Sequence, residues 1–538
     1  MKKLNSINII SVVIICFLLI DCSTKSQPDA KPNIIIIYTD DQGYGDVGAL
    51  NPEAKFRTPN MDRIANEGII FTDGHSSDAV CTPSRYSLLT GRYSWRTSLK
   101  KGVLGADGLC LIEKGRTTIA SLLKENGYNT AMVGKWHLQM QFAGTVGIDR
   151  NWSVPFIGGP IDNGFNYFFG IPASMNYGIL TYLENDKVLD PPVLWTKKKV
   201  VDDPRSFRDN VRPNDYRMTP PYQSEPGVGA GWIEAAQSFN DELVLEKFAS
   251  KAVDYINKVA QEDKPFFLYL PLTSPHLPHC THPDFKGRSN CGNYGDFIEE
   301  TDYRVGQVLD ALDANGIADN TLIIFSSDNG AETNYQYHGE TYQHYSSLHF
   351  KGGKRDIYEG GHRVPFLMRW PAAIKAGSKV DIPVSQTDYL ATVAEIVGVI
   401  LLDNAGEDSY SLLTAMKGKE YDDSLRGPVV HHSASGHFAI REGKWKLNML
   451  RGSGGSLEPT FFEPGGGEPL FELYDLEADP GETNNLYFEH QEIVDRLKNR
   501  ITTIIKNGRS TPGESQNYIK ANWDQLTWMD IIRIDKSK

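Results

Sequence analysis

Four consecutive isoleucines at residues 34–37, followed closely by Asp40 and Asp41, constrain the fold of this chain most. An apolar run without polar alternation is typical of a strand that is buried on both faces, as in a parallel sheet. Similar strand patterns recur at residues 130–134, 265–271 and 321–330, and helical patterns lie between them at residues 117–127, 235–260 and 297–315. This alternation predicts an α/β fold with a large mixed, mostly parallel sheet sandwiched by helices.

After about residue 425 the pattern changes to short strands separated by glycine-rich turns. Such strands are expected within residues 429–433, 437–443, 444–450 and 470–476, and a helix follows at residues 490–506. We therefore expect a large domain over residues 33–425. A smaller C-terminal α+β domain, made of antiparallel strands and a helix, is expected over residues 426–538.

The composition limits the classes of function. Of the 538 residues, 40% are hydrophobic and 23% are charged, which is typical of a globular protein. The formal net charge of -13 argues against general nucleic-acid binding. Because this charge gives no long-range attraction for anions, any anion-binding site must be locally basic.

The N-terminus has the features of an export signal. Lys2 and Lys3 precede an apolar run over residues 7–20, which is too short and too interrupted to span a bilayer comfortably. The residues before Cys22 loosely resemble a bacterial lipobox, although Asp21 is unusual directly before the cysteine. Either Cys22 carries a lipid anchor or the signal is simply cleaved a few residues further on. Residues 23–32 then form a polar tether, and we expect the protein in the periplasm or at the cell surface, with membrane contact only through such an anchor.

Apart from two cysteines in this N-terminal segment, the chain has four, at positions 81, 110, 280 and 291. In the oxidising compartment of an exported protein, Cys280 and Cys291 can form a local disulfide that leaves Cys110 free. Unbridged structural cysteines are the alternative, because pairing cannot be deduced from sequence.

The run CTPSRYSLLTGR, residues 81–92, places a thiol, a proline and a cation within one helical turn. Pro83 suits the first turn of a helix, where its missing N–H is not needed, so a helix is expected here. Cys81 then lies at the positive end of that helix, a position that lowers a thiol's pKa and favours a bound anion. Arg85, about one turn further on, is expected to face the same anion. If Cys81 stood alone, the simpler interpretation would be that it is a small buried hydrophobic residue and that Arg85 is a surface charge.

This run resembles the signature of the type I sulfatases, the formylglycine-dependent members of the alkaline phosphatase superfamily. The matching positions are Cys81, Pro83, Ser84, Arg85, Leu88, Leu89, Thr90, Gly91 and Arg92. The resemblance implies that a maturation enzyme oxidises Cys81 to formylglycine (3-oxoalanine), whose hydrated aldehyde supplies the nucleophile. The run ELYDLEADPGETNNL, residues 472–486, resembles the ending of many sulfatases, so the likeness spans nearly the whole mature chain. It makes residues 33–425 the catalytic domain.

The aspartates at the strand ends predict a metal site. Asp40, Asp41, Asp328 and Asn329 directly follow predicted strands, at the sheet edge where ligands bind in open α/β folds. Their oxygen atoms suit calcium or magnesium, whereas a D-D or D-N-G sequence alone more often forms a turn. The resemblance implies that these residues bind one divalent ion, usually Ca²⁺ and less often Mg²⁺. The group derived from Cys81 completes its shell, and no further cofactor is expected.

Four more residues match catalytic positions of the family. Lys135 and His137 lie two residues apart at the end of a predicted strand, in the motif GKWH. The resemblance implies that Lys135 binds the sulfate and that His137 holds the hydrated aldehyde and later takes its proton. By the same match, His276 contacts the sulfate and is a candidate general acid, and Lys354 is the cation at the leaving-group oxygen. Arg85 completes the set that neutralises the sulfate.

Other residues near these motifs are second choices. The histidines within residues 276–282 have spacings that suggest zinc, but flanking prolines and the lack of a matching cysteine set argue against it. Of these histidines, His279 and His282 are expected in the loop or at the substrate rim. Lys351 and His362 are second choices to the lysine named above.

Together these positions imply a sulfatase that hydrolyses sulfate esters through a calcium-assisted sulfo-enzyme intermediate. Asp328 is a candidate acceptor for the proton of the attacking hydroxyl. A phosphonate or phosphate ester hydrolase of the same superfamily is one alternative, and an inactive protein that binds sulfated glycans is another. The export signal and the aromatic-rich insertion at residues 166–178 favour a sulfated poly- or oligosaccharide as substrate. A segment rich in proline and charge, residues 195–232, is expected to form a specificity loop.

Overall fold

The computed structural model describes residues 31–197, 216–217, 232–419, 426–463, 465–519, 523–526 and 528–529. The chain divides into a short N-terminal unit, Met1–Lys31, and a main unit, Pro32–Lys538. The predicted export signal with Cys22, and most of the segment 195–232, lie outside the described residues. In the part of the chain that is described, no helix has the length and apolar character needed to cross a membrane.

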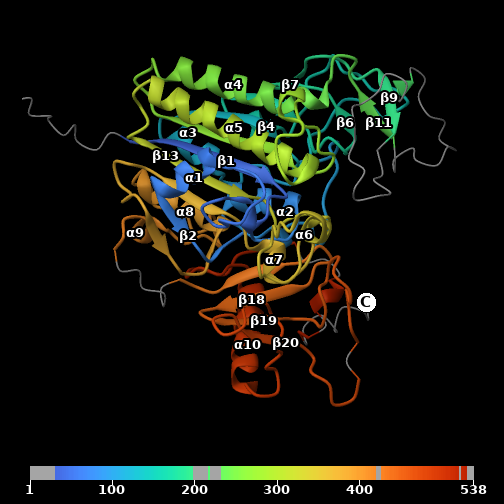
Figure 1. The fold of residues 1–538 in the computed structure, drawn as a ribbon, viewed down its shortest axis with the longest axis vertical. Coiled ribbons are helices and arrows are strands. Elements are labelled where there is room, and N and C mark those ends of the chain that lie inside the picture. The colour runs from blue at the N-terminus through green and yellow to red at the C-terminus, as the bar shows by residue number, and fades with distance from the viewer. Residues whose placement is uncertain are drawn as a thin grey trace, which may run out of the picture. The chain divides into compact units, whose positions relative to one another are not determined.

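A ten-stranded mixed sheet forms the centre of the main unit (Figure 1). Its strands are, in spatial order, β15 (Ser378–Val380), β2 (Ile69–Phe71), β14 (Phe366–Arg369), β13 (Thr321–Ser327), β1 (Asn33–Asp40), β12 (Phe266–Pro275), β4 (Asn129–Lys135), β5 (Tyr167–Ile171), β7 (Leu183–Glu184) and β8 (Lys187–Val188). The five strands from β13 to β5 are mutually parallel, and β14 and β7 run antiparallel to this block. The predicted mixed, mostly parallel sheet is confirmed, and the four apolar runs of the sequence are β1, β4, β12 and β13.

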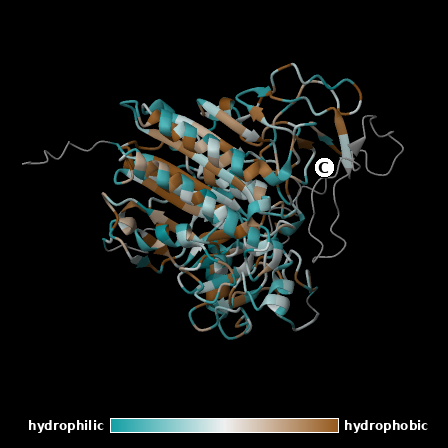
Figure 2. Ribbon diagram, turned by 45° about the horizontal axis from the view of Figure 1, so that its top comes forward, coloured by the Kyte–Doolittle hydropathy of each residue, from teal (hydrophilic) through white to brown (hydrophobic). Residues whose placement is uncertain are grey.

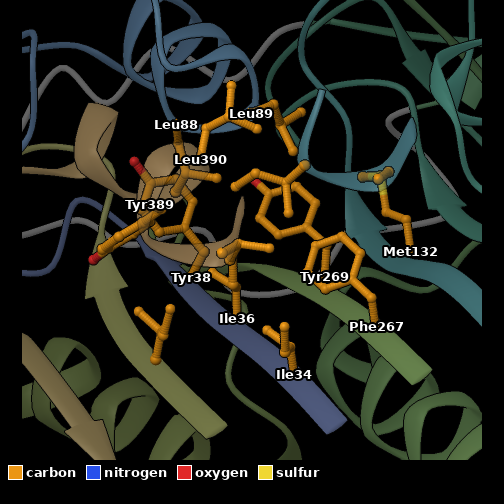
Figure 3. Close-up of a cluster of buried hydrophobic side chains, with 14 of the residues drawn as sticks. Ile34, Ile36, Tyr38, Leu88, Leu89, Met132, Phe267, Tyr269, Tyr389 and Leu390 are labelled. Atoms are coloured by element: carbon orange, nitrogen blue, oxygen red, sulfur yellow. The ribbon is translucent and has the colours of Figure 1, made fainter. Parts of the chain in front are cut away.

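Helices cover both faces of this sheet. One face carries α1 (Pro59–Asn66), α4 (Val244–Val259) and α5 (Gly292–Ala314), and the other carries α2 (Cys81–Thr90), α3 (Ile119–Glu125), α8 (Tyr389–Ile396) and α9 (Leu413–Met416). The strand β1 serves both cores, because Ile35 and Ile37 face α4 and α5 whereas Ile34 and Ile36 face the opposite side. Figure 3 shows this second core, in which leucines of α2 and α8 lie over β1, β12 and β4. In Figure 2 apolar residues concentrate in these central strands.

One predicted helix begins later than the sequence suggested. The pattern over residues 235–260 yields α4 only from Val244, because Ala235 ends the strand β11 (Trp232–Ala235). The side chain of Asn240 then accepts a hydrogen bond from the backbone of Glu242 and starts a short 3₁₀ turn. Smaller elements complete this region: β6 (Ile179–Leu180), β9 (Leu194–Lys197) and β10 (Tyr216–Arg217) form a four-stranded sheet with β11, and β3 (Gly74–His75) pairs with β16 (Val384–Ser385).

The C-terminal part forms a separate antiparallel sheet with one helix, as expected. Its strands are β17 (Val429–His432), β18 (Phe438–Glu442), β19 (Trp445–Asn448) and β20 (Glu472–Asp475), against which α10 (Gln491–Asn507) packs. Backbone hydrogen bonds join this sheet to two loops of the main sheet: Ala79 N donates to His432 O at 3.0 Å, and Ala434 N donates to Arg355 O at 3.0 Å. The predicted boundary at residue 425 stays a prediction.

None of the four cysteines of the described residues forms a disulfide. Cys280 lies in the core under α4 and α5, whereas Cys291 packs in a separate cluster with Phe56 and Tyr294. Of the two alternatives that the sequence left open, the unbridged one is therefore the one in the structure.

Candidate active site

Four adjacent parallel strands bring the predicted residues to one edge of the sheet. Asp40 ends β1, Lys135 ends β4, His276 follows β12, and Asp328 follows β13. These strands are neighbours in the order β13-β1-β12-β4, and all run in the same direction. Because the carboxyl ends of parallel strands meet at one edge, the four side chains converge in the crevice where open α/β sheets bind their ligands. Cys81, the first residue of α2, lies at the same edge.

The helix expected around Pro83 is α2. It begins at Cys81 and ends before Gly91, whose φ of 61° provides the left-handed C-cap. The expected effect on the thiol was wrong: burial raises the pKa of Cys81, although Lys135 and Lys354 nearby act in the opposite direction. Desolvation therefore outweighs the position at the helix N-terminus.

The metal-ligand candidates share a compact network. Asn329 Nδ2 donates to Asp41 Oδ1 at 2.8 Å, and the backbone N–H of Asp41 donates to Asp328 Oδ1 at 3.1 Å. Ligand atoms of Asp40, Asp328 and Cys81 lie within 4.8 Å of one another. The left-handed backbone of Asp41, with φ of 69°, turns the chain directly after β1 so that consecutive aspartates face the same crevice.

Three acceptor oxygens in this network lack a hydrogen-bond donor among the described residues: Asp40 Oδ1, Gln42 Oε1 and Asn329 Oδ1. All three side chains are fully buried. A buried oxygen without a partner costs free energy, and a hard divalent cation can satisfy several such oxygens at once. This donor set of carboxylate and amide oxygens therefore fits calcium or magnesium.

Three buried cations pair with the three carboxylates. Arg85 donates to Asp328 Oδ2 through Nε at 3.0 Å and through Nη2 at 2.7 Å. Lys135 Nζ lies 2.5 Å from Asp40 Oδ2, and Lys354 Nζ lies 2.6 Å from the carboxylate of Asp41. Because the three cations balance the three carboxylates, a divalent cation bound here would make the cluster locally basic, as an acidic protein needs in order to bind an anion.

Burial and these charges shift the pKa values of the site. For Asp40 burial is opposed by the cations, chiefly Lys135, which hold its pKa well below the usual range. Burial, together with the neighbouring Asp40, raises the pKa of Asp328 to about 7. Burial and nearby lysines lower the pKa of both His137 and His276, so these imidazoles are neutral at pH 7.

The hydrogen bonds of His137 fix its tautomer. Its Nε2 lies 2.9 Å from the carbonyl oxygen of Leu104, so Nε2 carries the proton and donates it. Its Nδ1 is buried and has no hydrogen-bond partner among the described residues. This leaves Nδ1 as a free acceptor at the site. His276 is slightly exposed, at 8%, and its Nε2 lies 3.8 Å from Asp41 Oδ2.

Two residues of the site, Ser174 and Glu332, had no signal in the sequence. Ser174 accepts a hydrogen bond from Lys135 Nζ at 2.8 Å. Glu332 lies 3.4 Å from Lys354 Nζ and also forms a two-pronged ion pair with Arg355. Ser174 falls within the aromatic-rich insertion noted above, but a single serine or glutamate in a loop carries no pattern that reveals such a contact.

The second-choice residues lie elsewhere. Lys351 Nζ lies 3.7 Å from the centre of the Tyr358 ring and donates to a backbone carbonyl, outside the cluster of carboxylates. His279 lies in the loop, one of the two places expected, and not at a rim, because it is 3% exposed and packs against aromatic rings. His282 pairs with Glu246 at 3.1 Å. Among the described residues, neither His279 nor His282 belongs to a metal-ligating group of three.

Comparison with known families decides which family the chain belongs to. The family model described as Sulfatase matches residues 32–399, and a second, described as N-sulphoglucosamine sulphohydrolase, C-terminal, matches residues 349–507. The chain belongs to the sulfatase family. It is therefore a sulfuric ester hydrolase, of a family that generally uses formylglycine and a divalent metal.

The chain is similar to individual sulfatases over most of their length, which supports this assignment. An N-acetylgalactosamine-6-O-sulfatase of Bacteroides thetaiotaomicron is 33% identical over 507 residues, which cover 90% of this chain and 96% of the relative. Human arylsulfatase A is 33% identical and covers 85% of this chain and 83% of its own length. A solved structure from work on the metabolism of multiple glycosaminoglycans by Bacteroides thetaiotaomicron has a TM-score of 0.74 and 30% identity. It covers 88% of this sulfatase and 99% of its own chain.

Proposed function

We propose that this sulfatase removes sulfate groups from a sulfated poly- or oligosaccharide after Cys81 has been converted to formylglycine. The observation that carries the proposal is the group of Cys81, Asp40 and Asp328, whose ligand atoms lie within 4.8 Å of one another beside three buried cations, with Asp40 Oδ1 lacking a hydrogen-bond donor among the described residues. The carbohydrate class is supported by the relative that is an N-acetylgalactosamine-6-O-sulfatase. A second solved relative was obtained in complex with D-glucosamine-2-N,6-O-disulfate, but at 19% identity it supports the fold alone.

The three cations form the sulfate subsite in this proposal. Arg85 is held rigidly by Asp328, whereas Lys135 and Lys354 reach Asp40 and Asp41 through flexible side chains. Both lysines can turn toward an incoming anion without moving the backbone. Their charge removes the repulsion between the sulfate oxygens and an approaching nucleophile.

The residues Asp40, Asp41, Asp328 and Asn329 would hold the metal, for which we propose Ca²⁺. When bound, the ion would supply positive charge that polarises the sulfate ester. Formylglycine at position 81, once hydrated, would supply one hydroxyl as nucleophile and a second hydroxyl that an ordinary serine lacks.

The proposed reaction needs proton donors and acceptors, and the neighbours of each candidate residue determine whether it carries a proton. The carboxylate of Asp328, with its raised pKa, accepts the proton of the attacking hydroxyl. We propose Lys354 Nζ as the donor that protonates the departing alcohol oxygen. His276 is the alternative, but its Nε2 can donate only when the ring is protonated, because Nδ1 faces the carbonyl oxygen of Leu277 and carries the proton of the neutral imidazole. In the last step His137 Nδ1 would accept the proton of the second hydroxyl at position 81, while the aldehyde forms again and sulfate leaves with the electrons of the broken C–O bond. This nitrogen has no hydrogen-bond partner among the described residues.

Mass spectrometry of the peptide that contains residue 81 tests the proposal, on protein made with a formylglycine-generating enzyme. The expected result is loss of the thiol and gain of an aldehyde, together with turnover of nitrophenyl sulfate. Turnover of sulfated sugars should then exceed turnover of their phosphate analogues. An intact thiol in fully active protein would exclude formylglycine as the nucleophile, and faster turnover of nitrophenyl phosphate would point to a phosphate ester hydrolase.

We further propose that residues 1–22 direct export to the periplasm or cell surface. The mass of the mature N-terminus tests this: a diacylated Cys22 means a lipid anchor, and an unmodified N-terminus beyond it means simple cleavage. Recovery of the full-length chain from the cytoplasm of the native host would contradict export.

A further inference from the structure

The loop between β5 and β6 brings an aromatic ring to the catalytic candidates. The ring of Tyr177 lies 5.1 Å from the ring of His137, measured between centroids. The preceding residue anchors the loop, because Asn176 Nδ2 donates at 3.2 Å to the carbonyl oxygen of Leu277, which also faces His276 Nδ1. Tyr177 is only partly buried, so part of its ring stays accessible beside the active site.

An ion pair directly beside Lys354 is a second feature that the sulfate and metal sites leave unused. Both Nη atoms of Arg355 donate to the carboxylate of Glu332, Nη2 at 2.9 Å. The oxygens of this carboxylate are occupied, because one also accepts from the backbone N–H of Thr333 at 2.8 Å and the other lies 3.4 Å from Lys354 Nζ. The Arg355 side chain is 36% exposed, and a guanidinium carries more N–H groups than one carboxylate takes. The pair therefore offers hydrogen-bond donors with little net charge.

The backbone of Arg355 has a conformation that residues other than glycine rarely adopt, with φ of 83°. Its N–H donates to Ala79 O at 2.7 Å, and its carbonyl oxygen accepts from Ala434 N at 3.0 Å. Because Ala79 lies two residues before Cys81, the first of these bonds ties Arg355 to the segment that carries the nucleophile. Backbone strain of this kind persists where the surrounding structure imposes it, and it is concentrated at ligand sites.

Tyr177 and Arg355 belong to the same entrance above residue 81. Burial raises the pKa of Tyr177, and the groups that also act on its hydroxyl include the thiol of Cys81 and the cations of Lys354 and Arg355. A sugar whose sulfate reaches residue 81 therefore lies within reach of both side chains.

We infer that Tyr177 and Arg355 determine which sugar the active site accepts, and that this sugar is uncharged apart from the sulfate ester that is hydrolysed. Tyr177 packs its ring on an apolar face of the sugar, and the remaining N–H groups of Arg355 donate to a hydroxyl. A second sulfate or a carboxylate on the same sugar gains no net attraction there, because Glu332 already neutralises Arg355. The inference rests on the proposed function, since it specifies the substrate of the same site.

The test compares kcat/KM values of the matured enzyme for three kinds of substrate. These are nitrophenyl sulfate, galactose and N-acetylgalactosamine with one sulfate at O3, O4 or O6, and the disulfated forms of the same sugars. The wild type should hydrolyse a monosulfated sugar, with a kcat/KM about 10-fold above that for its disulfated forms.

Arg355→Met should lower kcat/KM for the preferred monosulfated sugar about 10- to 100-fold, because hydrogen bonds to the sugar are lost. The loss for nitrophenyl sulfate should be much smaller, since its leaving group has no hydroxyl for Arg355. Tyr177→Ala should raise KM for the sugar about 10-fold, and Tyr177→Phe, which keeps the ring, should restore it. The matched control is Arg369→Met, which breaks an ion pair with Glu67 at the opposite edge of the sheet and should leave the ratio between the substrates unchanged.

Glu332→Gln separates recognition from a structural role. The amide leaves the charge of Arg355 unopposed, so the ratio of kcat/KM for the disulfated sugar to that for the monosulfated sugar should rise about 10-fold. This ratio is independent of any loss that reaches all substrates through Lys354, which Glu332 also contacts.

Four results would overturn the inference. They are a wild type that prefers the disulfated sugar, an equal loss on sugar and nitrophenyl sulfate in Arg355→Met, an unchanged ratio in Glu332→Gln, or hydrolysis of nitrophenyl sulfate without hydrolysis of any monosulfated sugar. Each of these leaves the sulfatase activity standing. A matured wild type that hydrolysed none of these sulfates would instead overturn the proposed function, and the inference with it.

Discussion

Two buried ionic clusters in this sulfatase each contain three carboxylates and three cations, but they differ in function. The active-site cluster holds Asp40, Asp41 and Asp328 with Arg85, Lys135 and Lys354. The interface cluster, between α7 (Glu359–His362) and the C-terminal sheet, holds Asp73, Glu359 and Glu482 with Arg363, Arg441 and Lys446. Three histidines, His75, His362 and His431, also lie in the interface cluster, and all of these side chains are at most 9% exposed. Figure 1 shows α7 beside β18 and β19.

The two clusters differ in which atoms are left without partners. In the active-site cluster the orphaned atoms are mainly acceptor oxygens, which a cation can satisfy. In the interface cluster Lys446 Nζ alone contacts Glu359 at 3.0 Å, Glu482 at 2.8 Å and His362 Nε2 at 3.1 Å. The orphaned atoms there are side-chain nitrogens of Arg441 and His431 and one oxygen, Glu482 Oε1. That oxygen already faces a cation, because Lys446 Nζ lies 2.8 Å away.

The ring geometry of the interface cluster also argues against a metal. The rings of His362 and His431 stack with centroids 3.7 Å apart and an angle of 9° between their planes. A metal ligated by imidazole lies near the plane of the ring, so two parallel stacked rings cannot direct their nitrogens at one ion. A cluster of buried charges therefore indicates a metal site only where acceptor oxygens remain unsatisfied; otherwise it indicates a structural network.

The largest expected effect is a loss of activity without a loss of stability, caused by replacing Cys81. Cys81→Ala should lower kcat/KM for nitrophenyl sulfate by more than about 10³-fold, because the nucleophile is lost. The melting temperature should change little, since the small side chain is replaced by another small one. The matched control is Cys110→Ala, which removes a half-buried thiol outside the cluster. Retained activity in Cys81→Ala would refute the proposed mechanism.

Breaking the interface cluster should affect stability instead. Lys446→Met leaves Glu359 and Glu482 buried without their shared cation, which should lower the free energy of unfolding by about 3–5 kcal/mol. Urea titration measures this loss. The control is Lys444→Met in the same sheet, where an exposed pair with Asp475 is lost and no measurable change is expected. Equal effects of the two substitutions would show that Lys446 does not stabilise the cluster.

Metal binding should affect only the active-site cluster. Ca²⁺ at a concentration of about 100 times its Kd should stabilise the folded enzyme by about 2.7 kcal/mol, and a chelator should slow turnover. Asp40→Asn should weaken the thermal shift with Ca²⁺, because a carboxylate ligand becomes an amide. Glu482→Gln in the interface cluster should keep the full shift. If the thermal shift with Ca²⁺ remained in Asp40→Asn and disappeared in Glu482→Gln, the metal would bind in the interface cluster and not in the active-site cluster.

The sequence predicted the active-site cluster far better than the interface cluster, for a physical reason. The strands β1, β4, β12 and β13 are continuous apolar runs, and the topology of a parallel sheet alone brings the residues at their ends together. The histidines of the interface cluster come from three distant segments of the chain with no shared motif. The sequence also indicated the wrong direction for the pKa of Cys81, because its position at a helix N-terminus can be read locally whereas its burial depends on the whole fold.

The smallest expected effect is a dependence of stability on pH that arises in the interface cluster. Burial, together with nearby positive or histidine groups, lowers the pKa of His362 and His431 well below that of an exposed histidine, and burial also lowers the pKa of His75. As the pH falls below about 6.5, these histidines take up protons in the unfolded chain but not in the folded chain, which lowers the stability. Glu482 in the same cluster acts in the opposite direction, because burial raises its pKa to about 7 and the folded chain binds this proton first, so it offsets part of the loss. Each histidine contributes at most about 1.4 kcal/mol per pH unit.

His431→Phe tests this contribution, because phenylalanine can keep the stacking on His362 but cannot bind a proton. Between pH 7.5 and pH 5.5 the free energy of unfolding of this variant should fall less steeply than that of the wild type, by the share of one histidine. His490→Ala, at a half-exposed position, should keep the wild-type slope. An unchanged slope in His431→Phe would mean that His431 takes up a proton in the folded protein as readily as in the unfolded chain. Such a result would require that the positive charges of Arg363, Arg441 and Lys446 do not repel a protonated His431. The three carboxylates that pair with these cations would then have to cancel their charge completely.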